Sequence, residues 1–199
     1  EKLWILFAVT LPIVFQPEIR RFLEQLGRGG FFPMRRLWSD KGAYDAIIEQ
    51  LCLAAGDLSR SRTGALMVIA RKTGLGEYLE SGTRLDAMVS ASLLQSIFFP
   101  NNPLHDGAVI IRDARIERAG CFLPLSDNPS LDRQLGTRHR AALGISEVSD
   151  AVVLIVSEET GQISLAYDGE IKRGIDQDEL KAMLVRQLYD DNDSSWRRR

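Results

Sequence analysis

Residues 65–70 read ALMVIA, a continuous apolar run that directly follows Gly64. A run of this length without polar alternation is typical of a β-strand that is buried on both faces. Such a strand needs other strands beside it and helices covering both sides of the sheet. The run therefore predicts the centre of a layered domain.

The chain on either side of this run alternates predicted helices and strands. Helices are predicted over residues 44–58, 90–99 and 178–188, and strands over 107–111, 116–123, 151–156 and 163–167. The last two strands are separated by a short turn that contains a glycine, which predicts a hairpin. We therefore expect an α/β layered domain with a central mixed β-sheet flanked by helices.

The composition is that of an ordinary globular domain. The 199 residues are 45% hydrophobic and 26% charged, which excludes a wholly disordered chain, a collagen and a polytopic membrane protein. The formal net charge of −2 is unlike the basic excess of a nucleic-acid-binding domain. Two cysteines, Cys52 and Cys121, make neither a disulfide framework nor a four-cysteine zinc site. Their apolar neighbours predict buried, unreactive thiols in a reducing cytoplasm.

The first residues differ from this soluble pattern. Residues 3–15 carry no charge, but a helix of this length rises only ~20 Å, less than the ~30 Å hydrocarbon core of a bilayer. The segment is either the end of a membrane helix or a buried helix. Basic residues outnumber acidic ones over 17–42, which is the pattern of a cytoplasmic flank at the cell membrane. We expect the end of a transmembrane helix at 1–16, a juxtamembrane helix and linker at 17–41, the globular domain at 42–189 and a flexible tail at 190–199.

The first candidate site is the turn at residues 103–108, PLHDGA, between a predicted helix and a predicted strand. Asp106 can bind a divalent cation or accept a proton from a hydroxyl, and His105 can assist in either role. Gly107 has no side chain, so a ligand can approach the backbone there. The alternative is an Asx turn, in which the Asp106 carboxylate bonds its own backbone.

The second candidate site is the segment at residues 136–142, GTRHRAA. Thr137 is the predicted N-cap of a helix, and Arg138, His139 and Arg140 then place up to three cations in its first turn. Each cation is disfavoured there by ~0.3–1 kcal/mol, because the N-terminus is the positive end of the helix dipole. A bound phosphate chain would explain the pattern, since free N–H groups and guanidinium groups would all face it. The alternative is a solvated basic patch.

A third group of polar residues lies at the tip of the predicted hairpin, where Ser157, Glu158 and Glu159 follow each other. If the hairpin tip lies near Asp106, these carboxylates could help to hold Mg²⁺ or Mn²⁺ through oxygen ligands. The alternative is that they are the solvated acidic residues of an ordinary turn.

Four runs of the chain carry a resemblance to a known family: LHDGAVI at 104–110, AGCFLPL at 119–125, LGTRHRAALGISEVSD at 135–150 and IVSEETGQIS at 155–164. They resemble the diadenylate cyclases, whose domain is also found at the N-terminus of the DNA-integrity scanning protein. Paired Asp-Gly-Ala and Arg-His-Arg motifs define that family, and both are intact here in the usual order. The apolar start resembles the membrane-bound branch, whose members carry three membrane helices before the catalytic domain.

The resemblance implies a metal-dependent enzyme that joins two ATP molecules into cyclic di-AMP and releases two pyrophosphates between two facing protomers. It implies that the catalytic residues are Asp106, Arg138, His139 and Arg140. It implies that the ATP-binding residues are Gly107, Ala108, Phe122, Leu123, Thr137, Arg138, His139, Arg140, Ser157 and Glu158. It implies a Mg²⁺ or Mn²⁺ site at Asp106, His105 and Glu159.

The resemblance also implies partners. They are a second copy of the chain, a YbbR-domain membrane regulator and phosphoglucosamine mutase, whereas no nucleic acid is expected. An alternative function is a non-catalytic sensor that binds ATP or cyclic di-AMP at the membrane. Such a sensor would carry a degenerate catalytic carboxylate, and the presence of Asp106 therefore favours the enzyme.

Overall fold

The structure, a computed structural model, describes residues 41–128 and 136–189. The predicted membrane-helix end at 1–16, the juxtamembrane segment up to residue 40 and the predicted tail at 190–199 lie outside these residues. Within the described ranges, no helix is both long enough and apolar enough to cross a bilayer.

A seven-stranded sheet forms the centre of the domain, in the order β2-β4-β3-β1-β5-β6-β7. The strands are β1 (Ala65–Ile69), β2 (Thr83–Met88), β3 (Ala108–Arg112), β4 (Arg115–Cys121), β5 (Val152–Val156), β6 (Ile163–Tyr167) and β7 (Glu170–Arg173). Strands β1 and β3 are parallel, and the other neighbouring pairs are antiparallel. The predicted mixed sheet is confirmed, as is the hairpin of β5 and β6.

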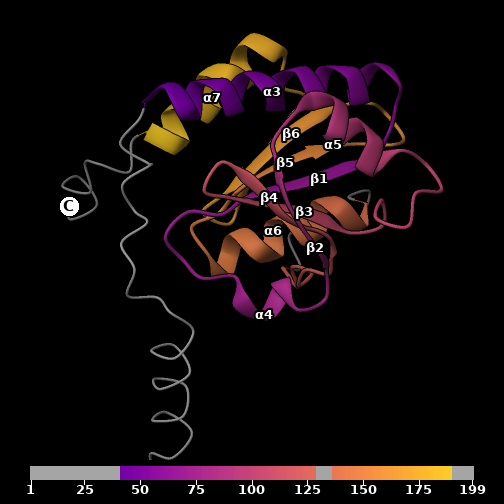
Figure 1. The fold of residues 1–199 in the computed structure, drawn as a ribbon, viewed down its shortest axis with the longest axis vertical. Helices are drawn as coiled ribbons and strands as arrows, with labels where there is room; N and C mark the ends of the chain where they lie inside the picture. Colours follow the sequence, from indigo (N-terminus) through magenta and orange to yellow (C-terminus); the bar gives the residue numbers. More distant parts are fainter. Residues whose placement is uncertain (1–40, 129–135, 190–199) are drawn as a thin grey trace, which may run out of the picture. The chain divides into compact units, whose positions relative to one another are not determined.

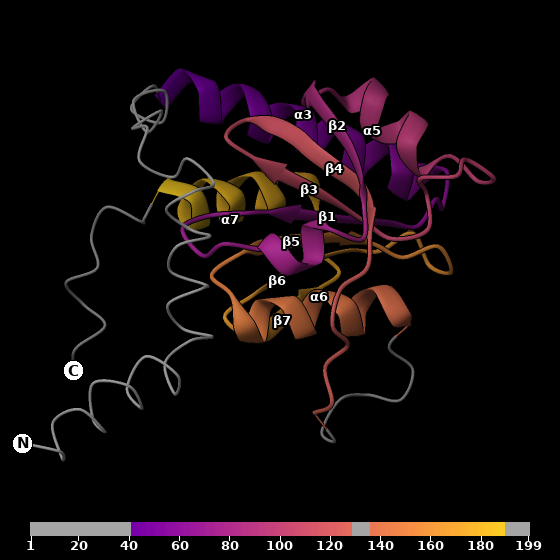
Figure 2. The ribbon, with the colours of Figure 1, turned by 60° about the horizontal axis from the view of Figure 1, so that its bottom comes forward.

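Helices cover both faces of this sheet (Figure 1, Figure 2). They are α3 (Lys41–Arg60), α4 (Gly76–Leu79), α5 (Ala91–Phe98), α6 (Thr137–Val148) and α7 (Gln177–Tyr189). Helices α3, α5 and α7 share one buried cluster with the sheet, and α4 and α6 share another with its opposite face. The domain therefore has three layers, with the sheet in the middle.

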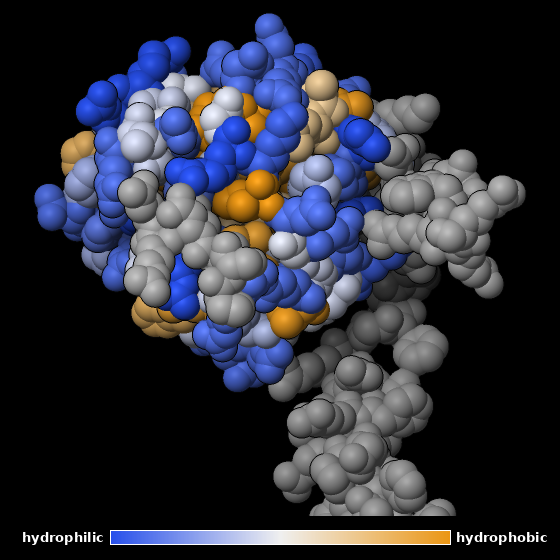
Figure 3. Space-filling model, turned by 180° about the vertical axis from the view of Figure 1, so that it is seen from behind, coloured by the Kyte–Doolittle hydropathy of each residue, from blue (hydrophilic) through white to orange (hydrophobic). Residues whose placement is uncertain are grey.

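The surface carries few large apolar side chains. On the face seen in Figure 3, apolar patches are separate and lie among hydrophilic residues. The exposed large apolar side chains of the described residues are Leu53, Met88, Phe99, Phe122, Leu125 and Val148. Among the described residues, the largest fully buried side chains therefore lie in the core and not in a surface patch.

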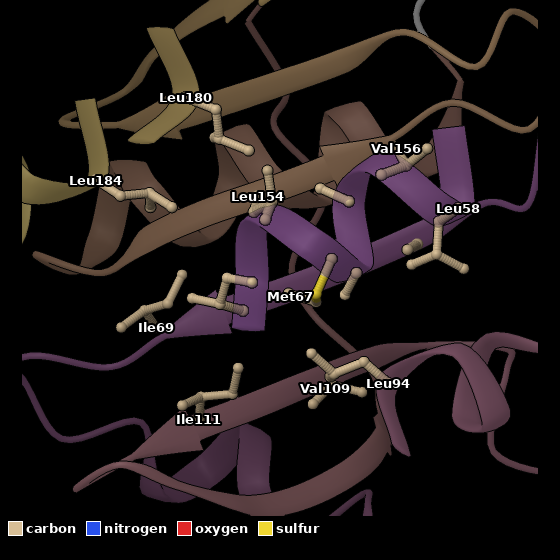
Figure 4. Close-up of a cluster of buried hydrophobic side chains, with 14 of the residues drawn as sticks. Leu58, Met67, Ile69, Leu94, Val109, Ile111, Leu154, Val156, Leu180 and Leu184 are labelled. Carbon is tan, nitrogen blue, oxygen red and sulfur yellow. The ribbon is translucent and has the colours of Figure 1, made fainter. Parts of the chain in front are cut away.

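Strand β1 shows how the apolar run produces the layers. Met67 and Ile69 belong to the cluster under α3, α5 and α7, whereas Leu66 and Val68 belong to the cluster under α6. Successive side chains of a strand point to opposite faces, so an unbroken apolar run supplies both clusters at once. Figure 4 shows Met67 and Ile69 on the first face, near Leu154 of β5. The predicted strand with two buried faces is confirmed.

The register of the strands brings two candidate segments to one end of the sheet. Met67 of β1 lies beside Val109 of β3 in parallel register, and Ala65 pairs with Val156 of β5. The start of β1, the start of β3 and the end of β5 are therefore level with each other. The turn that precedes β3 and the loop that follows β5 lie at this same end, about 10 Å apart, since two strand spacings separate them.

Candidate active site

Helix α6 begins at Thr137, at the same end of the sheet, and its N-cap is Gly136. The prediction that Thr137 is the N-cap is wrong by one residue. Gly136 has extended dihedral angles, and its carbonyl accepts hydrogen bonds from His139 N–H at 3.1 Å and Arg140 N–H at 3.2 Å. Because glycine has no side-chain acceptor, no side chain caps this helix start.

Arg138 is held at the helix start by an ion pair. Its Nη1 donates a hydrogen bond to Glu158 Oε2 at 2.6 Å, and Glu158 comes from the loop between β5 and β6. The Arg138 side chain is 20% exposed, whereas that of Glu158 is 61% exposed. Arg138 is therefore not part of a solvated basic patch, and Glu158 at the hairpin tip is not merely a solvated acid.

A hollow of about 60 Å³ lies between the start of α6 and the loop after β5. It gathers five of the predicted ATP-binding residues, Thr137, Arg138, His139, Ser157 and Glu158, together with the predicted metal ligand Glu159. Thr160, Gln162 and Arg173 also line it. These three carry no motif, and no signal in the sequence singles them out, because they reach the hollow only through the pairing of β5, β6 and β7.

His139 is buried under the helix start and does not act as a cation at neutral pH. Burial lowers the pKa of His139, the positive charge of Arg173 lowers it further, and Glu159 opposes the shift. A neutral imidazole follows, because the ordinary pKa of 6.5 is already below neutrality. The first turn of α6 therefore carries two cations, not the three that the sequence allowed.

Arg140 points toward a different partner. Its Nη2 donates to the carbonyl oxygen of Ser126 at 3.1 Å, and Ser126 N–H donates to the carbonyl of Arg140 at 3.0 Å. Gly144, one turn along α6, lets the same segment pack closely, since a Cβ there would lie 2.2 Å from the Pro124 carbonyl oxygen. Arg140 is not among the residues that line the hollow, so the structure brings Arg138 to it but not Arg140.

The turn before β3 is stabilised by Asn102, not by Asp106. Asn102 Oδ1 accepts from Leu104 N–H at 2.9 Å, and Asn102 Nδ2 donates to the carbonyl of Ser96 at 2.8 Å. Asp106 is exposed, and among the described residues its carboxylate has no hydrogen-bond or ion-pair partner. The Asx turn suggested for Asp106 is therefore wrong, and its carboxylate is available to a ligand.

A backbone carbonyl holds one ring nitrogen of the partly buried His105. Its Nδ1 lies 2.5 Å from the carbonyl oxygen of Asn102. A carbonyl oxygen only accepts, so Nδ1 must carry a proton, and in the neutral imidazole the lone pair is then on Nε2. A backbone carbonyl bound to one imidazole nitrogen is the usual support for a metal bound to the other. Nε2 of His105 is thus suited to act as a metal ligand.

The predicted adenosine-binding residues differ in what they can offer. Gly107 has a φ of 134°, and a Cβ there would lie 2.7 Å from the carbonyl carbon of Gly120 on β4. Strand β4, not a ligand, therefore makes the close approach that requires this glycine. Ala108 is fully buried, backbone included, so the structure does not expose it to a nucleotide. Leu123 is half-buried, and Phe122 is 67% exposed, which leaves its ring available to stack on a base.

One chain does not complete a metal site from the residues described. Among them, no group of three or more His, Cys, Asp or Glu side chains lies close enough together to hold an ion. The predicted set is divided, because His105 and Asp106 lie on the turn before β3 and Glu159 lines the hollow. The cysteines offer no nucleophile either, since burial raises the pKa of both Cys52 and Cys121 to about 11.

Comparison with known proteins adds independent information. A family model described as DisA bacterial checkpoint controller nucleotide-binding matches residues 52–171. The chain is 51% identical over 181 residues to the cyclic di-AMP synthase CdaA of Bacillus subtilis (strain 168), covering 91% of this chain and 65% of that protein. It is 48% identical over 185 residues to a diadenylate cyclase of Listeria monocytogenes serotype 1/2a (strain 10403S), covering 93% of this chain and 67% of that protein. The chain thus spans about two thirds of the length of these curated relatives.

The fold is also that of solved proteins. A crystal structure of a double mutant of DacA from Staphylococcus aureus matches with a TM-score of 0.71 and 46% identity, covering 72% of this chain and 96% of that one. A structure described as a hypothetical membrane spanning protein from Bacillus cereus matches with a TM-score of 0.62 and 46% identity, covering 64% of this chain and 62% of that one. The layered α/β fold expected from the sequence is confirmed.

Proposed function

Because the chain belongs to the diadenylate cyclase family, which shares the nucleotide-binding domain of the DisA checkpoint controller, we propose that it condenses two ATP molecules into cyclic di-AMP and two pyrophosphates. One observation carries the proposal to particular residues. The Asp-Gly-Ala turn before β3 and the hollow at the start of α6 lie at the same end of the sheet, as the register of β1, β3 and β5 requires.

Each chain holds one ATP in this proposal. The triphosphate lies against the start of α6, where Arg138 and the uncapped helix terminus supply positive charge. Thr137 and Ser157 line the same hollow and donate hydroxyl hydrogen bonds to phosphate oxygens. Phe122 offers its exposed ring to the adenine. Arg140 contributes by fixing the segment that contains Ser126 on α6, and neutral His139 supports the first turn from beneath.

The reaction itself is an in-line transfer at each α-phosphate. The 3′-hydroxyl oxygen of one ATP attacks the α-phosphorus of the other, its proton passes to Asp106, and the bond to the β-phosphate breaks to release pyrophosphate. The same step in the opposite direction closes the ring. The product has two-fold symmetry, so two chains that face each other through an isologous contact align both attacks.

The residues fit a divalent cation when two chains are considered together. His105 Nε2 and Asp106 of one chain, with Glu159 of the facing chain, would supply one nitrogen and carboxylate oxygens, a donor set that suits Mn²⁺ or Mg²⁺. When bound, such an ion would neutralise negative charge on the phosphates.

We further propose that the enzyme acts at the cell membrane, with this domain facing the cytoplasm. The basic flank at residues 17–42 and the similarity to a protein described as membrane spanning support this location. The YbbR-domain regulator and phosphoglucosamine mutase stay predictions of the family resemblance. Fractionation of cells that express the whole protein, with protease added to intact and to permeabilised cells, tests both the location and the orientation.

The function is tested by incubating the 199-residue chain with ATP and Mn²⁺ or Mg²⁺ and separating the products by chromatography. Cyclic di-AMP and two equivalents of pyrophosphate are expected. ATP binding without any product, at a protein concentration where sedimentation shows dimers, would favour the sensor over the enzyme.

A further inference from the structure

Gly64 is the residue directly before β1, and it lies against the ion pair between Arg138 and Glu158. It is buried, in the connection from α3 to the sheet. A Cβ atom built on it would lie 2.7 Å from Nη1 and 2.8 Å from Cζ of Arg138, and 2.8 Å from Oε2 of Glu158. Real Cβ atoms essentially never approach other heavy atoms within 3.0 Å. The ion pair therefore occupies the space that any side chain at position 64 would need.

The backbone itself does not require glycine at this position. Gly107 and Gly161 have positive φ angles, but Gly64 does not. Alanine is thus compatible with the local backbone conformation. The three atoms nearest to the added Cβ all belong to the side-chain ends of Arg138 and Glu158. The reason for glycine is therefore the position of these two side chains.

This contact determines where the guanidinium group of Arg138 can lie. Its side chain is only 20% exposed, so it rests on the start of β1 with Glu158 beside it. A guanidinium group binds phosphate oxygens through a planar set of donors, and a displacement of about 1 Å disrupts such a geometry. An added methyl group at position 64 would force a displacement of this order, because its contacts with Arg138 and Glu158 would be closer than 3.0 Å.

We infer that Gly64 is a positioning residue of the proposed nucleotide site, which lets Arg138 rest at the start of β1 where it faces the triphosphate. The inference rests on the proposed function and extends it to a residue that lies outside both family motifs. Gly64 touches no substrate in this assignment. It acts through Arg138 alone.

The variant Gly64→Ala tests the inference in the 199-residue chain. The atoms that clash are the ends of flexible side chains, so the melting temperature should change little, whereas the dissociation constant for ATP should rise about tenfold, as for the loss of one charge-assisted hydrogen bond. The KM for ATP should rise with it, and kcat should fall less. Binding of adenosine, which has no phosphate, should not change. Gly76→Ala is the matched control, because its added Cβ meets nothing within 4 Å and its φ is not positive.

A double-mutant cycle with Glu158→Ala separates crowding from other causes. Without the Glu158 carboxylate, the guanidinium of Arg138 has room to move away from an added methyl group, so Gly64→Ala should weaken ATP binding much less in that background. Titrations with ATP in EDTA keep metal binding by the neighbouring Glu159 out of the comparison. Strictly additive effects would overturn the inference.

The remaining outcomes are also decisive. If the unsubstituted chain does not bind ATP, the proposed function fails and the inference fails with it. If the unsubstituted chain binds ATP and Gly64→Ala binds it equally well, only the inference fails. A Gly64→Ala chain that does not fold would also overturn it, because the glycine would then serve the fold and not the ion pair.

Discussion

In the part of the chain that the structure describes, the carboxylate of Asp106 makes no hydrogen bond or ion pair that would stabilise the fold. The carboxylate of Asp86 accepts a hydrogen bond from Arg115. The carboxylate of Asp150 accepts hydrogen bonds from the backbone N–H groups of Lys72 and Thr73. Among the described residues, nothing holds Asp106 in this way. An exposed acid that contributes no bond to its own turn can be changed without a cost to the fold. A substitution at Asp106 can therefore change the catalytic rate without changing the free energy of unfolding.

We expect Asp106→Asn to bind ATP with nearly unchanged affinity and to lose turnover by about 10²- to 10⁴-fold, because an amide cannot accept the proton of the attacking hydroxyl. Cyclic di-AMP production, ATP titration and thermal unfolding measure the three quantities. Production at the rate of the unsubstituted chain would refute the role of Asp106.

Arg138 and Arg140 are neighbours in the motif but have different contacts. Arg138→Ala should weaken binding of ATP far more than binding of adenosine, and should leave the free energy of unfolding nearly unchanged. Arg140→Ala should lower the free energy of unfolding by about 1 kcal/mol, because the hydrogen bond to the Ser126 carbonyl is lost. Arg140→Ala should weaken ATP binding less than Arg138→Ala does. Isothermal titration and urea unfolding of both variants check this, and equal losses of ATP affinity would contradict it.

At the scale of elements, Asp150 ties the loop after β1 to the start of β5. Its two carboxylate oxygens accept from Lys72 N–H at 3.0 Å and Thr73 N–H at 2.9 Å. Burial alone would raise the pKa of Asp150, but the hydrogen bonds from Thr73 and Lys72 outweigh burial and lower it below 3.8. The ionised form is therefore favoured in the folded chain.

The sign of the pH dependence follows from this lowered pKa. The stabilising contribution of Asp150 is fully present at a pH well above 3.8, the ordinary pKa of this carboxyl group. It is lost as the pH falls through the lower pKa that the group has in the folded chain. Asp150→Asn should lower the free energy of unfolding by about 1 kcal/mol at pH 7, since the site is partly open to solvent. Urea unfolding from pH 7 to pH 3 should show the gap between the two chains closing at the acid end. A gap that stays constant would contradict the assignment.

Among the strands, those that the sequence predicts best have two buried faces. Strands β1 and β5 are unbroken apolar runs, and each was predicted at nearly its observed bounds. The edge strands β2 and β7 were missed. Strand β2 contains Arg84 and Asp86 around a break in its register, and β7 has four residues, most of them exposed. Edge strands have no need of apolar residues on both faces, so apolar patterning does not reveal them.

The same distinction holds for the site. The motifs predict a site at Asp106 and at the start of α6, since each motif is continuous in sequence. The charge of His139, the partner of Arg140 and the place of Gly64 depend on contacts between distant segments, and no local pattern contains them. Motif residues are predicted by sequence, whereas their surroundings require the fold.

At the scale of the whole molecule, each chain holds half of what the proposed reaction needs. The predicted metal ligands of one chain do not gather into a group of three among the described residues, and two ATP molecules must meet with their reacting groups opposed. The proposed two-fold pair of chains would supply both requirements, because the turn of Asp106 in one chain would lie opposite the hollow of the other. Activity should therefore belong to the pair, whereas ATP binding should belong to each chain.

This division predicts a dependence on protein concentration. Below the dissociation constant of the pair, the concentration of pairs rises with the square of the chain concentration, so doubling the protein should raise the total rate about fourfold and the specific activity about twofold. ATP bound per chain should stay constant over the same range. Initial rates across a hundredfold dilution series, with sedimentation at each concentration, measure both quantities. A constant specific activity where sedimentation shows only single chains would mean that one chain closes the ring alone, and the arrangement of two facing sites would then be wrong.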